Sequence, residues 1–280
     1  MPLPSLDEPQ RLYLDLLKKC VTRFVTGGEG WRPFEPPRGT LKRALYRPIA
    51  GLLLWWGLRL AIPAPFDPAK REQGLDWPAE AETMIGLRRL ENLEALIVDL
   101  VRRDVPGDLV ETGVWRGGAT IFMRGVLKVL GDTSRLVWAC DSFAGLPKAD
   151  PERYPADAGD PHWSFAELVA SLDQVKANFA RYGLLDEQVC FLEGWFRDTL
   201  PGAPMERIAL LRLDGDMYES TYVALEALYP RVALGGFVVV DDYGAIPTCR
   251  QAVTDYRERN GIGEPMHPID WTGVYWRRLV

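Results

Sequence analysis

The sequence predicts an α/β fold, in which a doubly wound, mainly parallel seven-stranded sheet follows a helical N-terminal extension. After residue 107, short apolar runs alternate with segments of helical periodicity, which is typical of βα units around a parallel sheet. The 280 residues are 47% hydrophobic and 26% charged, so the chain holds enough apolar material for one large core. Five of the predicted strands end in an acidic residue, which predicts a ligand-binding rim at one edge of the sheet.

The first 75 residues are expected to form the extension, and residues 76–280 the main domain. Four apolar residues at helical spacing predict an amphipathic helix over residues 8–25: Leu12, Leu16, Cys20 and Phe24. Residues 27–39 and 63–74 are rich in proline, glycine and polar residues, so we expect loops there.

The most apolar window of the chain runs from Ile49 to Ile62 within the extension. It contains Arg59 and falls short of the roughly 18 apolar residues that a membrane span needs. Three roles stay open for residues 41–62, namely a lid over the substrate mouth, an oligomer contact and a membrane-surface contact. We expect a homo-oligomer.

The main domain begins with a helix over residues 81–103, which ends before the Val-Pro-Gly turn at residues 105–107. The strands that follow are expected at 108–112, 135–141, 189–193, 208–214 and 236–241, with two more near 266–269 and 273–278. The helices between them are expected near 118–130, 166–181 and 218–229.

Five predicted strands end in an acidic residue: Glu111, Asp141, Glu193, Asp214 and Asp241. In open α/β sheets, ligands bind beyond the carboxyl ends of the strands. We therefore expect these five side chains to converge on one site.

Charge and cysteine content narrow the class of ligand and the compartment. The chain has 33 Lys and Arg against 39 Asp and Glu, a net charge of −6, which disfavours nucleic acid as a partner and favours a small molecule. The four widely spaced cysteines form no metal-binding pair, so we expect buried thiols in a reducing compartment. The N-terminus lacks the pattern of a secretory signal, and the cytoplasm is therefore expected.

The first βα turn, residues 111–118, contains glycines that let a ligand approach the backbone, but not the GxGxxG pattern of dinucleotide sites. Glu111 beside this turn favours a cationic group over a phosphate. S-adenosylmethionine, whose amino and sulfonium groups are positive, fits this chemistry. A merely tight connection is the alternative.

Two later strand ends could complete a nucleoside site. Asp141 stands where an acidic side chain accepts hydrogen bonds from a ribose diol, although it could instead cap the turn that begins at Ser142. The turn Glu193-Gly-Trp-Phe offers aromatic faces for adenine, and core packing of these rings is the alternative.

The sequence Asp214-Gly-Asp216, followed by the pair Asp241-Asp242 at the next strand end, predicts a metal site. Neighbouring parallel strands would bring these carboxylates together, and without a cation they would repel one another. Carboxylates without histidine or cysteine favour a hard cation such as Mg²⁺.

Ten ordered strings resemble the macrocin/mycinamicin O-methyltransferase family: LYLDLLKK, TMIGLRRLENL, LVETGVWRGGA, CDSFAGLP, RYGLLDEQV, GWFRDTLP, LRLDGDMYEST, GGFVVVDDY, CRQAV and GVYWRR. The resemblance covers residues 11–25 and about 80–280. It implies a Rossmann-like class I methyltransferase that uses S-adenosylmethionine and Mg²⁺ to methylate sugar hydroxyls of natural products. Residues 27–75 do not match, so the acceptor stays open.

The resemblance also implies which residues form the site. The metal would be held by Asp214, Asp241 and Asp242. Asp216 and His162 are the two candidates for the base that deprotonates the acceptor. The cofactor would contact Thr83, Met84, Glu111, Thr112, Gly113, Val114, Trp115, Gly117, Asp141, Ser142, Phe143, Gly194, Trp195, Phe196 and Asp214.

Three other functions are weighed against this one. A catechol-type O-methyltransferase would use the same metal chemistry on a phenolic acceptor. An NAD(P)-dependent oxidoreductase is disfavoured by the missing GxGxxG pattern. A non-catalytic, membrane-associated methyltransferase-fold protein is disfavoured because every acidic strand end is intact.

Overall fold

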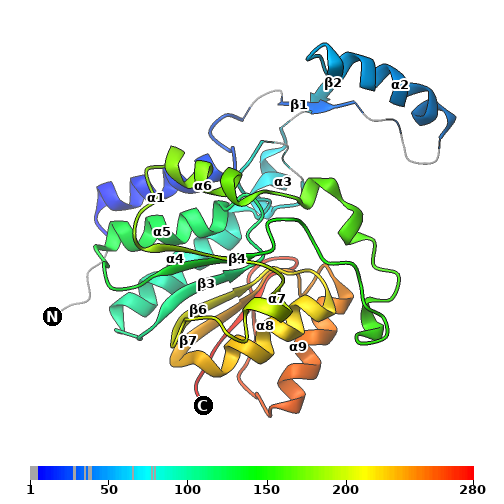
Figure 1. Ribbon diagram of the computed structural model, residues 1–280. Helices are drawn as coiled ribbons and strands as arrows, with labels where there is room; N and C mark the ends of the chain where they lie inside the picture. Colours follow the sequence, from blue (N-terminus) through cyan, green and yellow to red (C-terminus); the bar gives the residue numbers. More distant parts are fainter. Residues whose placement is uncertain are drawn as a thin grey trace.

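A seven-stranded sheet forms the centre of the molecule, and helices cover both of its faces (Figure 1). The computed structural model describes residues 6–27, 30–34, 36, 40–64, 66–76, 78 and 80–280. The strand order is β5-β4-β3-β6-β7-β9-β8. The first five of these strands are parallel, whereas β9 is antiparallel to both β7 and β8. The predicted doubly wound, mainly parallel sheet is confirmed.

The strands of this sheet are β3 (Asp108–Thr112), β4 (Val137–Asp141), β5 (Val189–Glu193), β6 (Ile208–Leu213), β7 (Val232–Val240), β8 (His267–Pro268) and β9 (Val274–Arg277). All seven agree with the predicted strands to within a few residues. The central strand β6 is buried along its whole length. This burial fits its continuous apolar run, because strands covered on both faces do not alternate.

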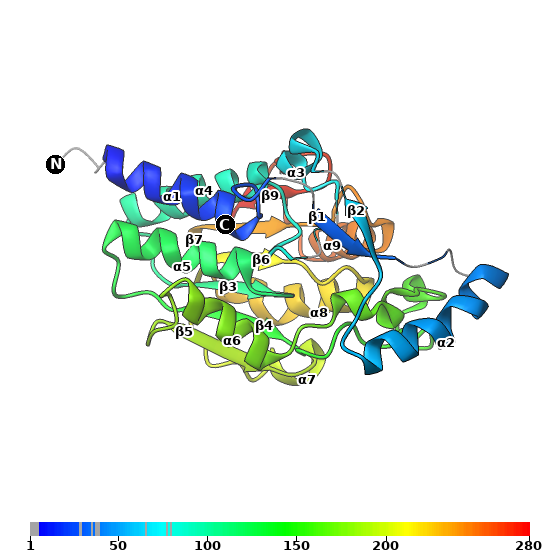
Figure 2. The same cartoon turned by 90° about the horizontal axis from the view of Figure 1, so that it is seen from above.

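Two layers of helices enclose the sheet (Figure 2). The helices α4 (Leu87–Arg102), α5 (Gly118–Leu130) and α6 (Leu172–Arg181) pack on one face. The helices α7 (Phe196–Thr199), α8 (Tyr218–Leu228) and α9 (Pro247–Arg259) lie on the other. The helix α1 (Glu8–Val21) packs against α4 and α5 from outside.

The first helix is present, but it ends at Val21, and its predicted stripe is not the buried one. Leu12 and Leu16 are exposed, whereas Leu14 and Leu17 face the core. The glycine at position 125 of α5 makes room for Leu17, since a Cβ atom there would stand 2.3 Å from the Leu17 Cδ2 atom. The helix therefore has two apolar stripes, and its packing partner selects between them.

Several elements were not predicted. The helix α9 was missed, and the helix expected over residues 166–181 begins only at Leu172, after short 3-10 turns at His162–Ser164 and Ala166–Leu168. The predicted loop at 63–74 contains α3 (Pro68–Gln73). Within the predicted loops, residues 28, 29, 35, 37–39 and 65 lie outside the described part of the chain.

The strands β1 (Gly30–Pro33) and β2 (Ala61–Ala64) pair with each other and join α2 (Leu41–Trp55) to the body. This arm projects from the main domain in both views (Figures 1 and 2). No residue of α2 is buried, and its Trp55 is 81% exposed. Among the described residues, no helix is both long and apolar enough to cross a membrane.

All four cysteines are free thiols. The prediction that they are buried is right for Cys140 and Cys249, but Cys20 and Cys190 are only half-buried. Cys190 lies on the edge strand β5, where one side of the sheet is less well covered.

Candidate active site

The acidic strand ends meet because the central strands end at the same level. Thr112 at the end of β3 pairs with Leu213 at the end of β6, and Leu213 pairs with Val240 of β7. A cavity of about 280 Å³ opens beyond these ends. We call it the site cavity. Four of the five acidic strand ends line it: Glu111, Asp141, Asp214 and Asp241.

The fifth acidic end does not fit the prediction. Glu193 is exposed and is not part of the cavity wall. It ends β5, which is the edge strand, so its side chain turns to solvent. The turn after it does reach the site, since Gly194, Trp195 and Phe196 line the cavity.

Most of the other residues implied by the family resemblance also line the site cavity: Thr83, Met84, Gly113, Val114, Trp115, Ser142, His162, Asp216 and Asp242. Three of the implied cofactor residues lie behind the wall instead. Thr112 donates to the Arg212 carbonyl over 3.4 Å, Gly117 precedes α5 with a φ of 89°, and the buried Phe143 ring contacts Phe191 edge-on.

Asp141 ties the turn after β3 to the turn after β4. Its carboxylate accepts hydrogen bonds from the backbone N–H groups of Val114 at 2.6 Å, Trp115 at 3.3 Å and Phe143 at 2.8 Å. The side chain thus shapes both turns, in addition to standing at the cavity wall. Burial raises the pKa of this carboxyl, while the three backbone donors oppose that rise.

Backbone strain is concentrated at these turns. The φ angles of Trp115, Phe143 and Asp216 are 49°, 52° and 59°. Residues other than glycine rarely adopt such positive values. Each residue follows the end of one central strand. Strained backbone of this kind persists only where the surrounding structure holds it, and it is often found at functional sites.

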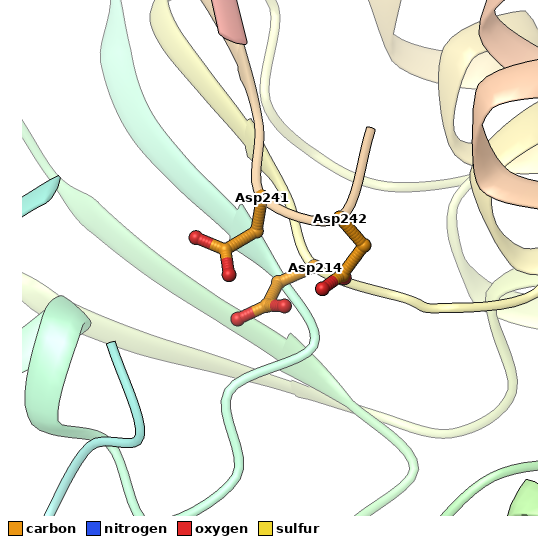
Figure 3. A group of neighbouring side chains, drawn as sticks. All are labelled: Asp214, Asp241 and Asp242. Carbon is orange, nitrogen blue, oxygen red and sulfur yellow. The ribbon is translucent and has the colours of Figure 1, made fainter. Parts of the chain in front are cut away.

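Three carboxylates form the predicted metal cluster (Figure 3). One oxygen from each of Asp214, Asp241 and Asp242 lies within 4.8 Å of the others. The Asp242 Oδ2 atom is buried and has no hydrogen-bond partner, which is costly unless a cation joins it. Burial, followed by the charges of Asp216 and Asp214, raises the pKa of Asp242. A hard cation with oxygen ligands fits this donor set.

Two buried arginines hold this cluster in place, and neither was predicted from the sequence. Arg212 donates to Glu111 and Asp241, and to the Asp214 Oδ2 atom at 2.7 Å. Arg89 donates to the other oxygen of Asp241. The signal for Arg212 was present, since it is the single charged residue in the apolar strand of residues 208–213.

Asp216 lies beside the cluster, at the end of the turn after β6. Burial and the neighbouring Asp214 charge raise the pKa of Asp216 to about 7, and the charge of His162 opposes that rise. His162 lies in the loop between β4 and α6 and lines the same cavity. The two predicted base candidates are therefore brought together.

The segment with Thr83 and Met84 is fixed on two sides. The buried guanidinium of Arg71, on α3, donates to the carbonyls of Met84 and Ile85. On the other side, Gly118 donates to the Glu82 carbonyl at 2.8 Å, at the start of α5. The N-terminal extension thus supports one wall of the site cavity.

Comparison with protein families shows one match over almost the whole chain. Residues 10–278 match the family model described as macrocin O-methyltransferase (TylF). The match includes residues 27–75, so the expectation that this segment departs from the family was wrong.

Two relatives extend over nearly the full length. A protein from Streptomyces olivaceus, named 8-demethyl-8-(2,3-dimethoxy-alpha-L-rhamnosyl)-tetracenomycin-C 4'-O-methyltransferase, is 56% identical over 276 residues, which are 97% of this chain and 94% of the relative. Mycinamicin III 3''-O-methyltransferase from Micromonospora griseorubida is 46% identical over 270 residues, or 95% of this chain and 96% of the relative.

A solved structure shares the same architecture. The O-methyltransferase NovP is similar with a TM-score of 0.82 and 43% sequence identity, over 97% of this chain and 100% of that chain. The predicted class I methyltransferase fold is confirmed by this similarity.

Proposed function

Because the chain belongs to the macrocin O-methyltransferase family, we propose that it transfers a methyl group from S-adenosylmethionine to a hydroxyl of a sugar or polyhydroxylated natural product, with Mg²⁺. One observation carries this proposal. The three-aspartate cluster and the glycine-containing turn after β3 line a single cavity, so a methyl donor and a metal-bound acceptor can meet there. Proximity supplies much of the rate in such a transfer.

The cofactor would occupy the β3–β4 side of the site cavity. The turn of residues 113–115, shaped by Asp141, offers backbone groups to the methionine part. Asp141 and Ser142 stand at the ribose position, and the rings of Trp195 and Phe196 offer faces to the adenine. S-adenosylmethionine supplies an electrophilic methyl group on its sulfonium. Thr83 and Met84 close this side against water.

Asp214, Asp241 and Asp242 would hold Mg²⁺. The cation would orient two neighbouring oxygens of the acceptor and lower the pKa of the attacking hydroxyl. The arginines contribute before any cation arrives, because Arg212 and Arg89 fix both oxygens of Asp241. Of the three aspartates, Asp242 is the one whose Oδ2 atom has no hydrogen-bond partner in the protein, so this oxygen is available to a cation.

We assign the removal of the acceptor proton to Asp216 and the orientation of the acceptor, through a neighbouring hydroxyl, to His162. The sequence left both as base candidates. Asp216 lines the site cavity beside the cluster that would hold the metal, so its carboxylate is within reach of a hydroxyl bound there. Its strained backbone, with a φ of 59°, fixes the carboxylate next to the cluster.

A product assay tests this function. The purified protein is incubated with S-adenosylmethionine and Mg²⁺ against a rhamnosylated polyketide, a simple sugar diol and a catechol, and methylation is followed by mass spectrometry. We expect methylation of the glycosylated acceptor and loss of turnover in EDTA. Transfer to the catechol alone would favour the phenolic alternative, and S-adenosylhomocysteine binding without any turnover would favour a non-catalytic protein.

Self-association through residues 41–62 is part of the same proposal. Residues 41–62 contain Lys42, Arg43, Arg47 and Arg59 and no acidic residue, whereas the whole chain has a net charge of −6. The rest of a second copy is therefore acidic on balance, which favours association with this basic segment. Light scattering should give a multiple of 31.6 kDa, and replacing Trp55 and Trp56 with serine should lower it. Binding of the intact arm to anionic vesicles would favour the membrane alternative instead.

We also propose that the enzyme works in the cytoplasm, because a reducing compartment keeps its free thiols reduced. We propose that residues 1–75 form the N-terminal extension and that residues 76–280 form the methyltransferase domain.

A further inference from the structure

A short side-chain hydrogen bond is built into the loop that carries His162. The Asp160 Oδ1 atom lies 2.7 Å from the His162 Nδ1 atom and accepts the backbone N–H of the same histidine, also at 2.7 Å. The Asp160 side chain is only 8% exposed, and it does not line the site cavity. It therefore contacts the cavity through His162 alone.

This contact fixes which ring nitrogen carries the proton. A carboxylate can only accept hydrogen bonds, so the Nδ1 atom of His162 must donate. The tautomer of a neutral histidine is set by the hydrogen bond that its other nitrogen makes. Nε2 is then left with a free lone pair. The ring packs edge-on against Phe165 at a centroid distance of 5.3 Å, which limits its rotation.

The same loop is anchored to the helix that follows Asp216. Asp157 is fully buried, and its two oxygens accept the backbone N–H groups of Tyr218 at 2.8 Å and Glu219 at 2.9 Å. These are the first two residues of α8, which has no cap from its own chain segment. The Asp157 carbonyl also accepts the Asp160 N–H at 3.1 Å. His162 is thereby held at a set position relative to Asp216.

We propose that Asp160 is a positioning residue that fixes His162 with its Nε2 lone pair facing the site cavity, ready to accept a hydrogen bond from an acceptor hydroxyl next to the reacting one. This inference rests on the proposed methyl transfer. Asp157 supports the arrangement by docking the loop on α8. The carboxylate at position 160 acts on the reaction only through the histidine.

The tautomer can be observed directly, because the chain has only two histidines. In ¹⁵N-labelled protein, the His267→Gln variant leaves the ring signals of His162 alone. We expect the proton on Nδ1 in the wild type, and a shift of the proton toward Nε2 in Asp160→Ala. A proton on Nε2 in the wild type would overturn the inference, whether or not the protein shows methyl transfer.

Kinetics provide the second test. Asp160→Ala should lower kcat/KM about 10- to 100-fold, the range seen when an outer partner that orients a ligating histidine is removed. It should change the same kinetic parameter as His162→Ala, and the double variant should be no slower than His162→Ala. Asp160→Asn, which keeps one acceptor oxygen, should fall between wild type and Asp160→Ala.

Asp150→Ala is the matched control, since Asp150 caps the Arg153 N–H in the same loop and does not contact the histidine. It should retain wild-type kinetics. Losses that multiply in the double variant, or an Asp160→Ala enzyme with wild-type kinetics, would overturn the inference. Complete absence of methyl transfer in the wild type would count against the proposed function, while the tautomer measurement would still decide the pairing.

Discussion

The backbone of Gly113 lies against the carbonyl oxygen of Asp214. A Cβ atom at position 113 would stand 1.8 Å from that oxygen, and the φ angle of Gly113 is 90°. Two reasons therefore require glycine at position 113. Its backbone has a positive φ angle, and there is no room for a Cβ atom. The contact joins the turn after β3, where we propose that the cofactor binds, to the turn after β6, which carries the proposed metal ligand Asp214.

Gly113→Ala should damage both halves of the site. We expect S-adenosylhomocysteine affinity to fall at least about tenfold, because the methyl group must displace either turn, in addition to a strain of about 1–2 kcal/mol for a positive φ. Gly131→Ala is the control, with a φ of 69° and no atom within 4 Å of the added Cβ. Calorimetric titration and thermal unfolding of the two variants test this. Equal affinities in both would refute the proposed coupling of the turns.

The metal site can be tested at the ligand with an unpartnered oxygen. Asp242→Asn should lower turnover roughly 100-fold or more, because the metal contributes several kcal/mol of charge stabilisation. S-adenosylhomocysteine affinity should stay within about tenfold. Titration with Mn²⁺ should show the lost metal binding directly. Asp255→Asn removes the same charge on α9, where Asp255 accepts the Tyr218 hydroxyl, and should change neither property. Full activity of Asp242→Asn in EDTA would contradict the metal site.

The sheet and the acidic rim could be predicted from sequence because parallel strands place their ends at one edge, whatever packs around them. Asp214 and Asp241 follow adjacent strands and meet as expected. Glu193 has the same sequence pattern, yet its strand lies at the edge of the sheet. The order of the strands in the sheet decides whether an acidic strand end faces the cavity or solvent. This order cannot be inferred from the sequence of one strand alone.

The arginines and the buried face of α1 could not be predicted for a related reason. The sequence of α1 has two apolar stripes at helical spacing. Packing against α5 decides that the stripe with Leu14 and Leu17 is the buried one. Arg212 was visible as a charge in an apolar strand, but its partners Glu111 and Asp241 come from the ends of two other strands. Long-range partners of this kind are a property of the assembled fold.

Asp141→Ala should weaken S-adenosylhomocysteine binding by roughly 1.5–3 kcal/mol, the scale for hydrogen bonds to a charged group. Two causes combine, since the change removes an acceptor at the proposed ribose position and releases the N–H groups of Val114 and Phe143. Asp132→Ala is the control, because Asp132 caps the turn of Ser134 before β4, at the far end from the cavity. It should lower stability without changing affinity. Unchanged affinity in Asp141→Ala would leave Asp141 as a turn cap only.

The pH dependence of stability should show a contribution from Asp186. Its carboxylate accepts two hydrogen bonds from the buried Arg124, at 2.9 Å and 2.7 Å, and these bonds lower the pKa of Asp186. A lowered folded-state pKa means that this stabilisation is full above the unfolded pKa of about 3.9 and is lost as pH falls through the lower, folded value.

Asp186→Asn should therefore cost roughly 1.5–3 kcal/mol of unfolding free energy at pH 7. The difference from wild type should narrow below about pH 4. Asp15→Asn, which breaks the exposed pair with Lys19, should cost no more than about 1 kcal/mol. Urea unfolding from pH 3 to pH 7 measures both variants, and a difference that stays constant with pH would contradict the assignment.

The mechanism is tested most directly by determining which of Asp216 and His162 removes the acceptor proton. A base must be deprotonated to act, so kcat should rise with pH through its pKa and then level off. That profile alone does not separate the two groups, because the pKa of Asp216 is about 7 in this structure, close to the ordinary histidine value of about 6.5. Bound Mg²⁺ would lower the pKa of Asp216, so the rise should move to lower pH at saturating metal.

Substitution separates them. Asp216→Asn keeps the size of the side chain but cannot take a proton, and should lower kcat by about 10²–10⁴. His162→Ala should act mainly on KM if the histidine orients the acceptor through a neighbouring hydroxyl. Both variants should bind S-adenosylhomocysteine as the wild type does, which excludes a collapsed cavity as the cause. A larger kcat loss in His162→Ala, together with a rise near pH 6.5 that metal does not move, would transfer the base to His162, because only the carboxylate lies beside the metal cluster.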